Sequence, residues 1–216
     1  MSGQTLETPE LNMNLPETLT SLHIDSKQSA LNFYSESDRL GHRFHFADSQ
    51  TVIASVNAPQ GWNQTEGFPP SPIFQEIHEE ELPTGKAIML VGQWLKIHYS
   101  AVCLSPHDGL VDLQIAARVR SPEATQLAST YAVNLTASDL IHADQTEIRL
   151  KIGKDRLVRI CAGKESQLML TPVGLNGLQF QVLPIKPDSG SSESGSLSRT
   201  IQWSYTFELV RTENFV

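Results

Sequence analysis

Five side chains near the middle of the chain have the chemistry to hold a ligand: Trp94, Lys96, His98, Arg118 and Arg120. Cationic side chains attract an anionic group, and an indole ring offers a stacking face. Residues 94–104 and 110–120 alternate polar and apolar side chains, which is typical of two paired strands with one buried face. We therefore expect these side chains to lie together on the outer face of a hairpin and to contact a small polar or anionic ligand.

The register of this hairpin follows if its turn lies at Pro106-His107. The expected core face then carries Leu95, Ile97, Tyr99, Ala101 and Cys103 opposite Val119, Ala117, Ile115, Leu113 and Val111. On the outer face, Trp94 lies opposite Arg120 and Lys96 lies opposite Arg118. Like charges in direct opposition destabilise a strand pair, so Lys96 and Arg118 require an acidic neighbouring strand, such as residues 76–81, or an anionic ligand.

The histidines do not predict a metal site. The chain has seven histidines, but His42 and His45 are three residues apart, which on a strand places them on opposite faces. His78 precedes the acidic run Glu79 to Glu81 and has no second histidine nearby. We expect neither a metal nor a cofactor.

No nucleophile elbow, phosphate-binding loop or dinucleotide fingerprint occurs in the sequence. The sequence therefore favours a protein without enzymatic activity that binds a small polar or anionic ligand or a protein partner. The alternative is a hydrolase-type enzyme with its site in a cleft between the loop at residues 57–72 and the strands. Its catalytic residues are unknown, because groups assembled from distant strands leave no local spacing.

Gly92-Gln93-Trp94 resembles the Gly-x-Trp of lipocalins. In that family it lies on the first barrel strand, whereas here it lies in mid-chain. The resemblance covers three residues, and it implies a lipocalin-like ligand-binding barrel as a further alternative.

Short segments with alternating or β-branched residues recur along the chain, separated by turn-forming residues. Besides the hairpin, we expect strands at residues 19–24, 30–34, 42–46, 52–56, 73–82, 130–135, 146–152, 157–162, 167–170, 178–183 and 201–210. Helical turns are expected only at residues 121–123 and 138–142. This pattern predicts an all-β, single-domain antiparallel sandwich or barrel.

The remaining segments are expected to lie outside the strands. Residues 1–17 lack periodicity and predict a flexible arm before a β domain at residues 18–216. Residues 186–198, rich in Ser and Gly, predict a flexible insertion within that domain. In the loop at residues 57–72, Trp62 and Phe68 could cover the core edge or form a binding rim.

The charge of the chain bears on its partners and its location. The net charge is −8, and residues 1–108 hold 5 Lys and Arg against 13 Asp and Glu. Such acidity disfavours nucleic acid as a partner, because binding to it requires neutralisation of phosphates. No apolar run is long enough to cross a membrane, and the N-terminus has no features of a secretory signal, so we expect a cytoplasmic protein.

Basic residues gather around the expected turn at Gly153 to Asp155, namely Arg149, Lys151, Lys154, Arg156 and Arg159. This cationic hairpin could be a solvated face, or it could meet the acidic first half of a second copy in a homodimer. Cys103 and Cys161 lie in apolar segments, and we expect both to be buried free thiols.

Overall fold

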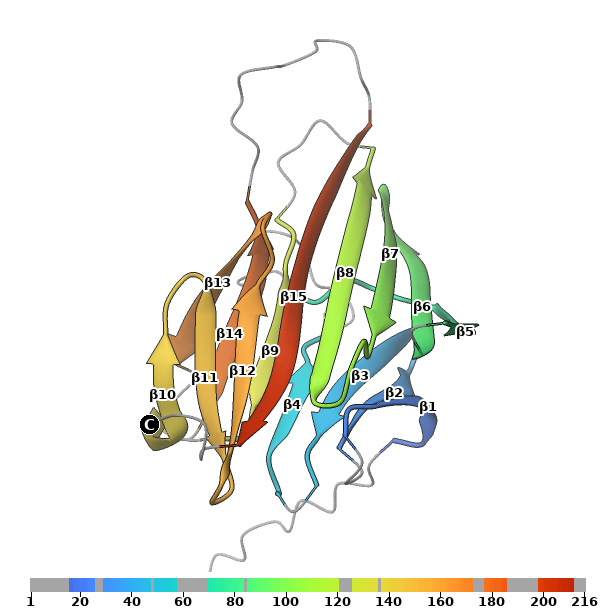
Figure 1. Cartoon of the computed structure of the whole chain (residues 1–216). Coiled ribbons are helices and arrows are strands. Elements are labelled where there is room, and N and C mark those ends of the chain that lie inside the picture. The colour runs from blue at the N-terminus through green and yellow to red at the C-terminus, as the bar shows by residue number, and fades with distance from the viewer. Residues whose placement is uncertain are drawn as a thin grey trace, which may run out of the picture.

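The strands form two antiparallel sheets that stack face to face as a sandwich and do not close into a barrel (Figure 1). The computed structural model describes residues 16–25, 29–47, 49–57, 70–83, 85–120, 126–135, 137–172, 177–185 and 198–211. These residues form fifteen strands and one 3-10 helix, η1 (Ala137–Asp139). The predicted all-β antiparallel fold is confirmed in its sandwich form, and the lipocalin-like barrel is wrong.

One sheet has seven strands, in the order β1-β2-β3-β4-β9-β14-β13. Its members are β1 (Thr18–His23), β2 (Ala30–Glu36), β3 (Arg39–His45), β4 (Val52–Ser55), β9 (Ser129–Val133), β14 (Leu178–Pro184) and β13 (Ser166–Pro172). Each of them overlaps a segment that the alternation of side chains predicts as a strand.

The other sheet has eight strands, in the order β10-β11-β12-β15-β8-β7-β6-β5. Its members are β10 (Leu140–Ala143), β11 (Glu147–Ile152), β12 (Arg156–Ala162), β15 (Arg199–Arg211), β8 (Leu110–Val119), β7 (Ile97–Leu104), β6 (Gly85–Trp94) and β5 (Glu76–Leu82). The acidic strand β5 lies at one edge with Glu79 to Glu81 exposed, as predicted. Charges at such an edge discourage pairing with another chain.

Two strands of this sheet were not predicted. In β6, the consecutive residues Ala87 and Ile88 are both buried, so the two-residue periodicity that marks a half-buried strand is absent there. The helical turn expected at residues 138–142 is wrong in its second half, because η1 ends at Asp139 and Leu140–Ala143 pairs with β11 as β10.

The core between the sheets is rich in aromatic rings and contains a chain of hydrogen bonds. Trp203, Tyr205 and Phe207 point inward from β15 and are buried. The hydroxyl of Tyr205 lies 2.7 Å from that of Tyr131 on β9, and Trp203 Nε1 donates to Ser129 Oγ at 2.9 Å. These contacts join the two sheets and fix which residues of β15 face outward.

Several expectations fall on residues outside those described. They are most of the arm at residues 1–17, nearly all of the insertion at residues 186–198, the turn at residues 121–123, and both Trp62 and Phe68. Within the described ranges, no helix has the length and apolar character needed to span a membrane.

Candidate functional site

The hairpin that carries the predicted ligand-contact residues forms with a different register. His98 of β7 pairs with Arg118 of β8, and Ile97 pairs with Val119, so the pairing is shifted by two residues from the predicted one. The connecting loop is held from outside the hairpin, because Gly109 N donates to Ile24 O at 2.6 Å and Leu209 N donates to Gly109 O at 2.7 Å. Within β7 and β8, a shift of two residues keeps the side chains on their expected faces.

The turn before β7 changes the position of two predicted residues. β6 ends at Trp94, which pairs with Ile97, so Leu95 and Lys96 form a two-residue turn between the strands. Leu95 has a φ of 53° and is 66% exposed, so its predicted place on the core face is wrong. Lys96 is exposed in this turn and does not lie opposite Arg118, so the predicted clash between these two charges is also wrong.

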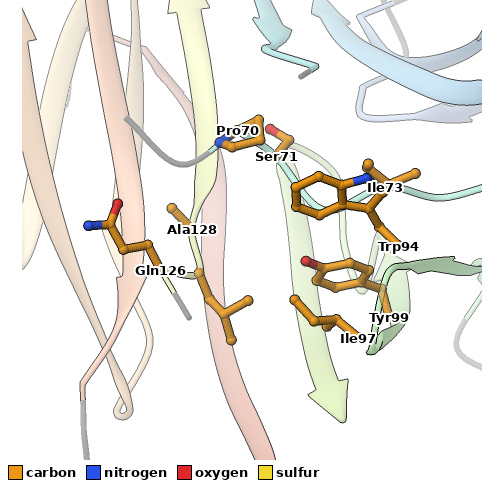
Figure 2. A pocket seen from close by; sticks show the side chains of 9 residues that line it. Pro70, Ser71, Ile73, Trp94, Ile97, Tyr99, Gln126 and Ala128 are labelled. Carbon is orange, nitrogen blue, oxygen red and sulfur yellow. The ribbon is translucent and has the colours of Figure 1, made fainter. Parts of the chain in front are cut away.

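Trp94 does not lie on the outer face. It is the direct partner of the buried Ile97, and paired residues project to the same side of a sheet. Figure 2 shows its ring next to that of Tyr99, in a small cavity at the end of the sandwich that Pro70 and Ser71 also line. The prediction that Trp94 shares a face with His98 and Arg118 is wrong, because the turn reverses the chain between residues 94 and 97.

Close packing against the segment before β5 explains the glycine at position 92, which the lipocalin resemblance included. A Cβ atom at this position would lie 2.2 Å from Ile73 O, so only glycine allows the segment before β5 to cross β6 here. Gln75 N donates to Val91 O at 2.9 Å at the same crossing.

The other four predicted residues gather at one end of the eight-stranded sheet, the upper end of β8 in Figure 1. His98 and Arg118 are cross-strand partners, and Arg120 N donates to Lys96 O at 2.9 Å. In the part of the chain that the structure describes, the side chains of these residues make no hydrogen bond and no ion pair. We call Lys96, His98, Arg118 and Arg120 the basic corner.

Several cations elsewhere on the eight-stranded sheet are paired with carboxylates. In the predicted cationic hairpin, Arg149 pairs with Glu147, Arg159 pairs with Glu208, and Arg156 lies 3.6 Å from Asp25. Lys86 likewise pairs with Glu79, with 2.6 Å between Nζ and Oε2. These pairs neutralise most of the predicted cationic hairpin and leave Lys151 and Lys154 as its exposed cations, with the exposed Asp155 next to Lys154.

A groove that sequence reasoning missed adjoins the basic corner on the outer face of the same sheet. Its floor consists of outward side chains of β7, β8 and β15, namely Ser100, Val102, Gln114, Ala116, Gln202 and Ser204. Its volume is about 370 Å³, which lies within the usual range for small-ligand sites of about 300 to 1,000 Å³. Ser100, Ala116 and Gln202 form the row next to His98, Arg118 and Thr200.

The turn between β12 and β13 forms one wall of this outer groove. Gly163 N donates to Ser204 O at 2.8 Å, and Ser204 N donates to Ser166 Oγ at 2.8 Å. A Cβ atom on Gly163 would lie 2.0 Å from Ser204 Oγ, so glycine is what allows this close approach. The two bonds fix Lys164 and Glu165 at the groove. No local sequence pattern predicts this contact between Gly163 and Ser204, which are far apart in the chain.

The cavity beside the loop at residues 57–72 is small. Trp94, Tyr99, Ser71 and Gln126 contribute to its lining, and its volume is about 10 Å³, enough for about one water molecule. Burial raises the pKa of the Tyr99 phenol, so its hydroxyl stays protonated at neutral pH. A space of this size does not accommodate a substrate.

The buried histidine and cysteine side chains lie in the core, away from the basic corner and the outer groove. His42 Nε2 lies 2.7 Å from Tyr131 Oη, and burial lowers the pKa of His42 to about 4. Burial raises the pKa of Cys103 to about 12, so this thiol is inert at neutral pH. Cys161 is a free thiol that is only partly buried, so the expectation that both thiols are buried is wrong for it. Among the described residues, no three His, Cys, Asp or Glu side chains form a metal-binding group.

The chain is thus a two-sheet antiparallel β-sandwich with a basic corner and an adjoining polar groove on the outer face of its larger sheet. No protein-family model, curated protein or solved structure matches it.

Proposed function

We propose that this protein is a binding module without enzymatic activity, and that it holds a small anionic ligand at the basic corner and in the outer groove. The observation that carries the proposal is the basic corner itself, whose cationic side chains lack partners within the described chain while the protein has a net charge of −8. Neighbouring like charges repel each other, and an anion bound between them would remove that repulsion.

The geometry of Arg118 supports this proposal. Its direct partners are His98 on one side and Thr200 on the other, so it has an imidazole and a hydroxyl as neighbours and no carboxylate. A guanidinium group suits phosphate and carboxylate because its N–H groups can donate two parallel hydrogen bonds. Thr200 and His98 can add further donors to the same anion.

The alternative of an enzyme has less support. A hydrolase site was expected in a cleft between the strands and the loop at residues 57–72, of which residues 58–69 lie outside those described. The cavity at the described end of this loop, which Pro70 and Ser71 line, holds about one water molecule. The exposed residues of the outer groove include Ser100, whose directly paired residues are Val91 and Ala116. His98 is the nearest residue of β7 on the same face, but among the described residues Ser100 Oγ makes no hydrogen bond to it or to any other base.

The test is a thermal-shift titration with inorganic phosphate on the wild type, Arg118→Ala and Lys154→Ala. Ligand that binds the folded state raises the Tm, so phosphate should stabilise the wild type and Lys154→Ala alike. Arg118→Ala should require about 10 to 100 times more phosphate for the same shift, which corresponds to a charged hydrogen bond of about 1.5 to 3 kcal/mol. An unchanged response of Arg118→Ala, or no response of the wild type, would refute the proposal.

A further inference from the structure

The outer groove has positive charge at one end only. The basic corner lies beyond the row of Ser100, Ala116 and Gln202, and it supplies positive charge there. At the other end, Lys164 and Glu165 carry opposite charges on the turn that forms the wall, and the carboxylate of Asp112 lies one row beyond Gln114. A ligand that fills the groove therefore meets positive charge at one end only.

The floor between these ends carries hydroxyl and amide groups. Gln114 Nε2 donates to Asp112 Oδ2 at 2.8 Å, which leaves the carbonyl oxygen of Gln114 as an acceptor. The exposed side chains of Gln202 and Ser100 can each donate and accept. Such a mixture matches a ligand whose own groups both donate and accept, as hydroxyl groups do.

The floor also contains the small apolar side chains of Val102 and Ala116. These give contacts for C–H groups between the hydroxyl groups of a ligand. From the row of Thr200 at the basic corner to the row of Ser204 in the groove, the corner and the groove together extend four residues along β15, which is about 13 Å at the rise of an antiparallel strand. A phosphate ion alone would therefore occupy only the end at the basic corner.

We infer that the ligand is a phosphorylated, polyhydroxylated molecule of the sugar-phosphate class, with its phosphate at the basic corner and its sugar body along the groove towards Lys164 and Glu165. This inference rests on the proposed function, since it assigns the anion to the same corner. It adds the chemical class of the body and its direction in the groove.

The experiment compares four probes by isothermal titration calorimetry: inorganic phosphate, glucose 6-phosphate, trehalose 6-phosphate and unphosphorylated trehalose. Trehalose 6-phosphate should bind at least about 10-fold more tightly than phosphate, as expected for one or two added hydrogen bonds to the floor. Unphosphorylated trehalose should bind far more weakly than trehalose 6-phosphate, because it lacks the group that the corner attracts.

Two variants separate the parts of the site. Arg118→Ala should lower the affinities for phosphate and for trehalose 6-phosphate by a similar factor of about 10 to 100. Gln202→Ala should lower only the affinity for trehalose 6-phosphate, by about 2- to 10-fold. The control is Gln145→Ala, which removes an exposed amide in the turn between β10 and β11 and should leave both affinities unchanged. Because these side chains are exposed, each variant should keep the circular dichroism spectrum and Tm of the wild type.

The outcomes distinguish the inference from the proposed function. If trehalose 6-phosphate binds no more tightly than phosphate, or if Gln202→Ala leaves its affinity unchanged, the inference is overturned and the anion-binding function stands. If trehalose binds as tightly as its phosphate, the inference is overturned because the anion contributes nothing. If none of the four probes binds, both the inference and the proposed function are overturned.

Discussion

His98 and Arg118 are direct cross-strand partners on the outer face of the larger sheet. They meet because β7 begins only at Ile97, after a two-residue turn formed by Leu95 and Lys96. This turn places His98 opposite Arg118 and sends Trp94 to the inner side, so the composition of the basic corner depends on it.

The turn should be improved by a residue that tolerates a left-handed backbone. Leu95 has a φ of 53°, a conformation that costs most L-residues about 1 to 2 kcal/mol and costs asparagine less. We expect Leu95→Asn to raise the free energy of unfolding by about 1 kcal/mol in urea denaturation. Leu95→Ala keeps the strain and serves as the control; equal stability of the two variants would contradict the turn.

The sequence predicts the alternating faces of the strands well and their connections poorly. The inward and outward sets of β8 and β15 follow from a two-residue period that burial of one face imposes. The turn at Leu95 and Lys96 lacks the Gly, Asn, Asp or Pro that normally marks a hairpin. The alternation of side chains therefore predicts one continuous strand, with residues 94, 96 and 98 on its outer face. The outer groove depends on contact between Gly163 and Ser204, and side-chain periodicity carries no information on such a contact.

Acid should destabilise the sandwich through His42. Its pKa is lowered by burial to about 4 from 6.5, so the unfolded state takes up a proton more readily than the folded state. The stability that neutral His42 provides is complete above pH 6.5 and is lost as the pH falls towards 4. The difference between the pKa values of His42 in the folded and unfolded states corresponds to about 3 kcal/mol of stability, at about 1.36 kcal/mol per pKa unit.

The matched variant for this effect is His42→Asn, which has an amide able to bond Tyr131 and no group that titrates in this range. Urea denaturation at pH 7, 5.5 and 4 should show the wild type losing up to about 3 kcal/mol more than the variant. Parallel losses in the two proteins would show that His42 does not contribute to acid sensitivity.

The wall of the outer groove should depend on Gly163. In Gly163→Ala, the new methyl group would meet Ser204 Oγ and push the turn between β12 and β13 away from β15. We expect a loss of stability of about 1 to 3 kcal/mol, since the bond from Gly163 N to Ser204 O breaks. Phosphate affinity should remain, while the additional affinity for trehalose 6-phosphate should fall. Retention of both the stability and the full affinity would contradict the description of the wall.

The homodimer predicted from the charge pattern should be weak and sensitive to salt. Most of the cationic hairpin is neutralised within the chain, and Lys151 and Lys154 remain exposed to meet the acidic strand β5 of a second copy. Sedimentation should show self-association at low salt that disappears at high salt. The double variant Lys151→Ala with Lys154→Ala should not self-associate at either salt concentration. A monomer at low and high salt alike would remove this proposal.

The central claim is that the basic corner binds an anion, and NMR tests it residue by residue. In a titration of the ¹⁵N-labelled protein with inorganic phosphate at constant ionic strength, the largest saturable shifts should belong to the backbone amides of Lys96, His98, Arg118 and Arg120. The amides of Lys151 and Lys154, which lie at the opposite end of the sheet in Figure 1, should shift little. Saturable shifts centred on Lys151 and Lys154, or shifts that grow linearly and evenly over the whole protein, would contradict the claim.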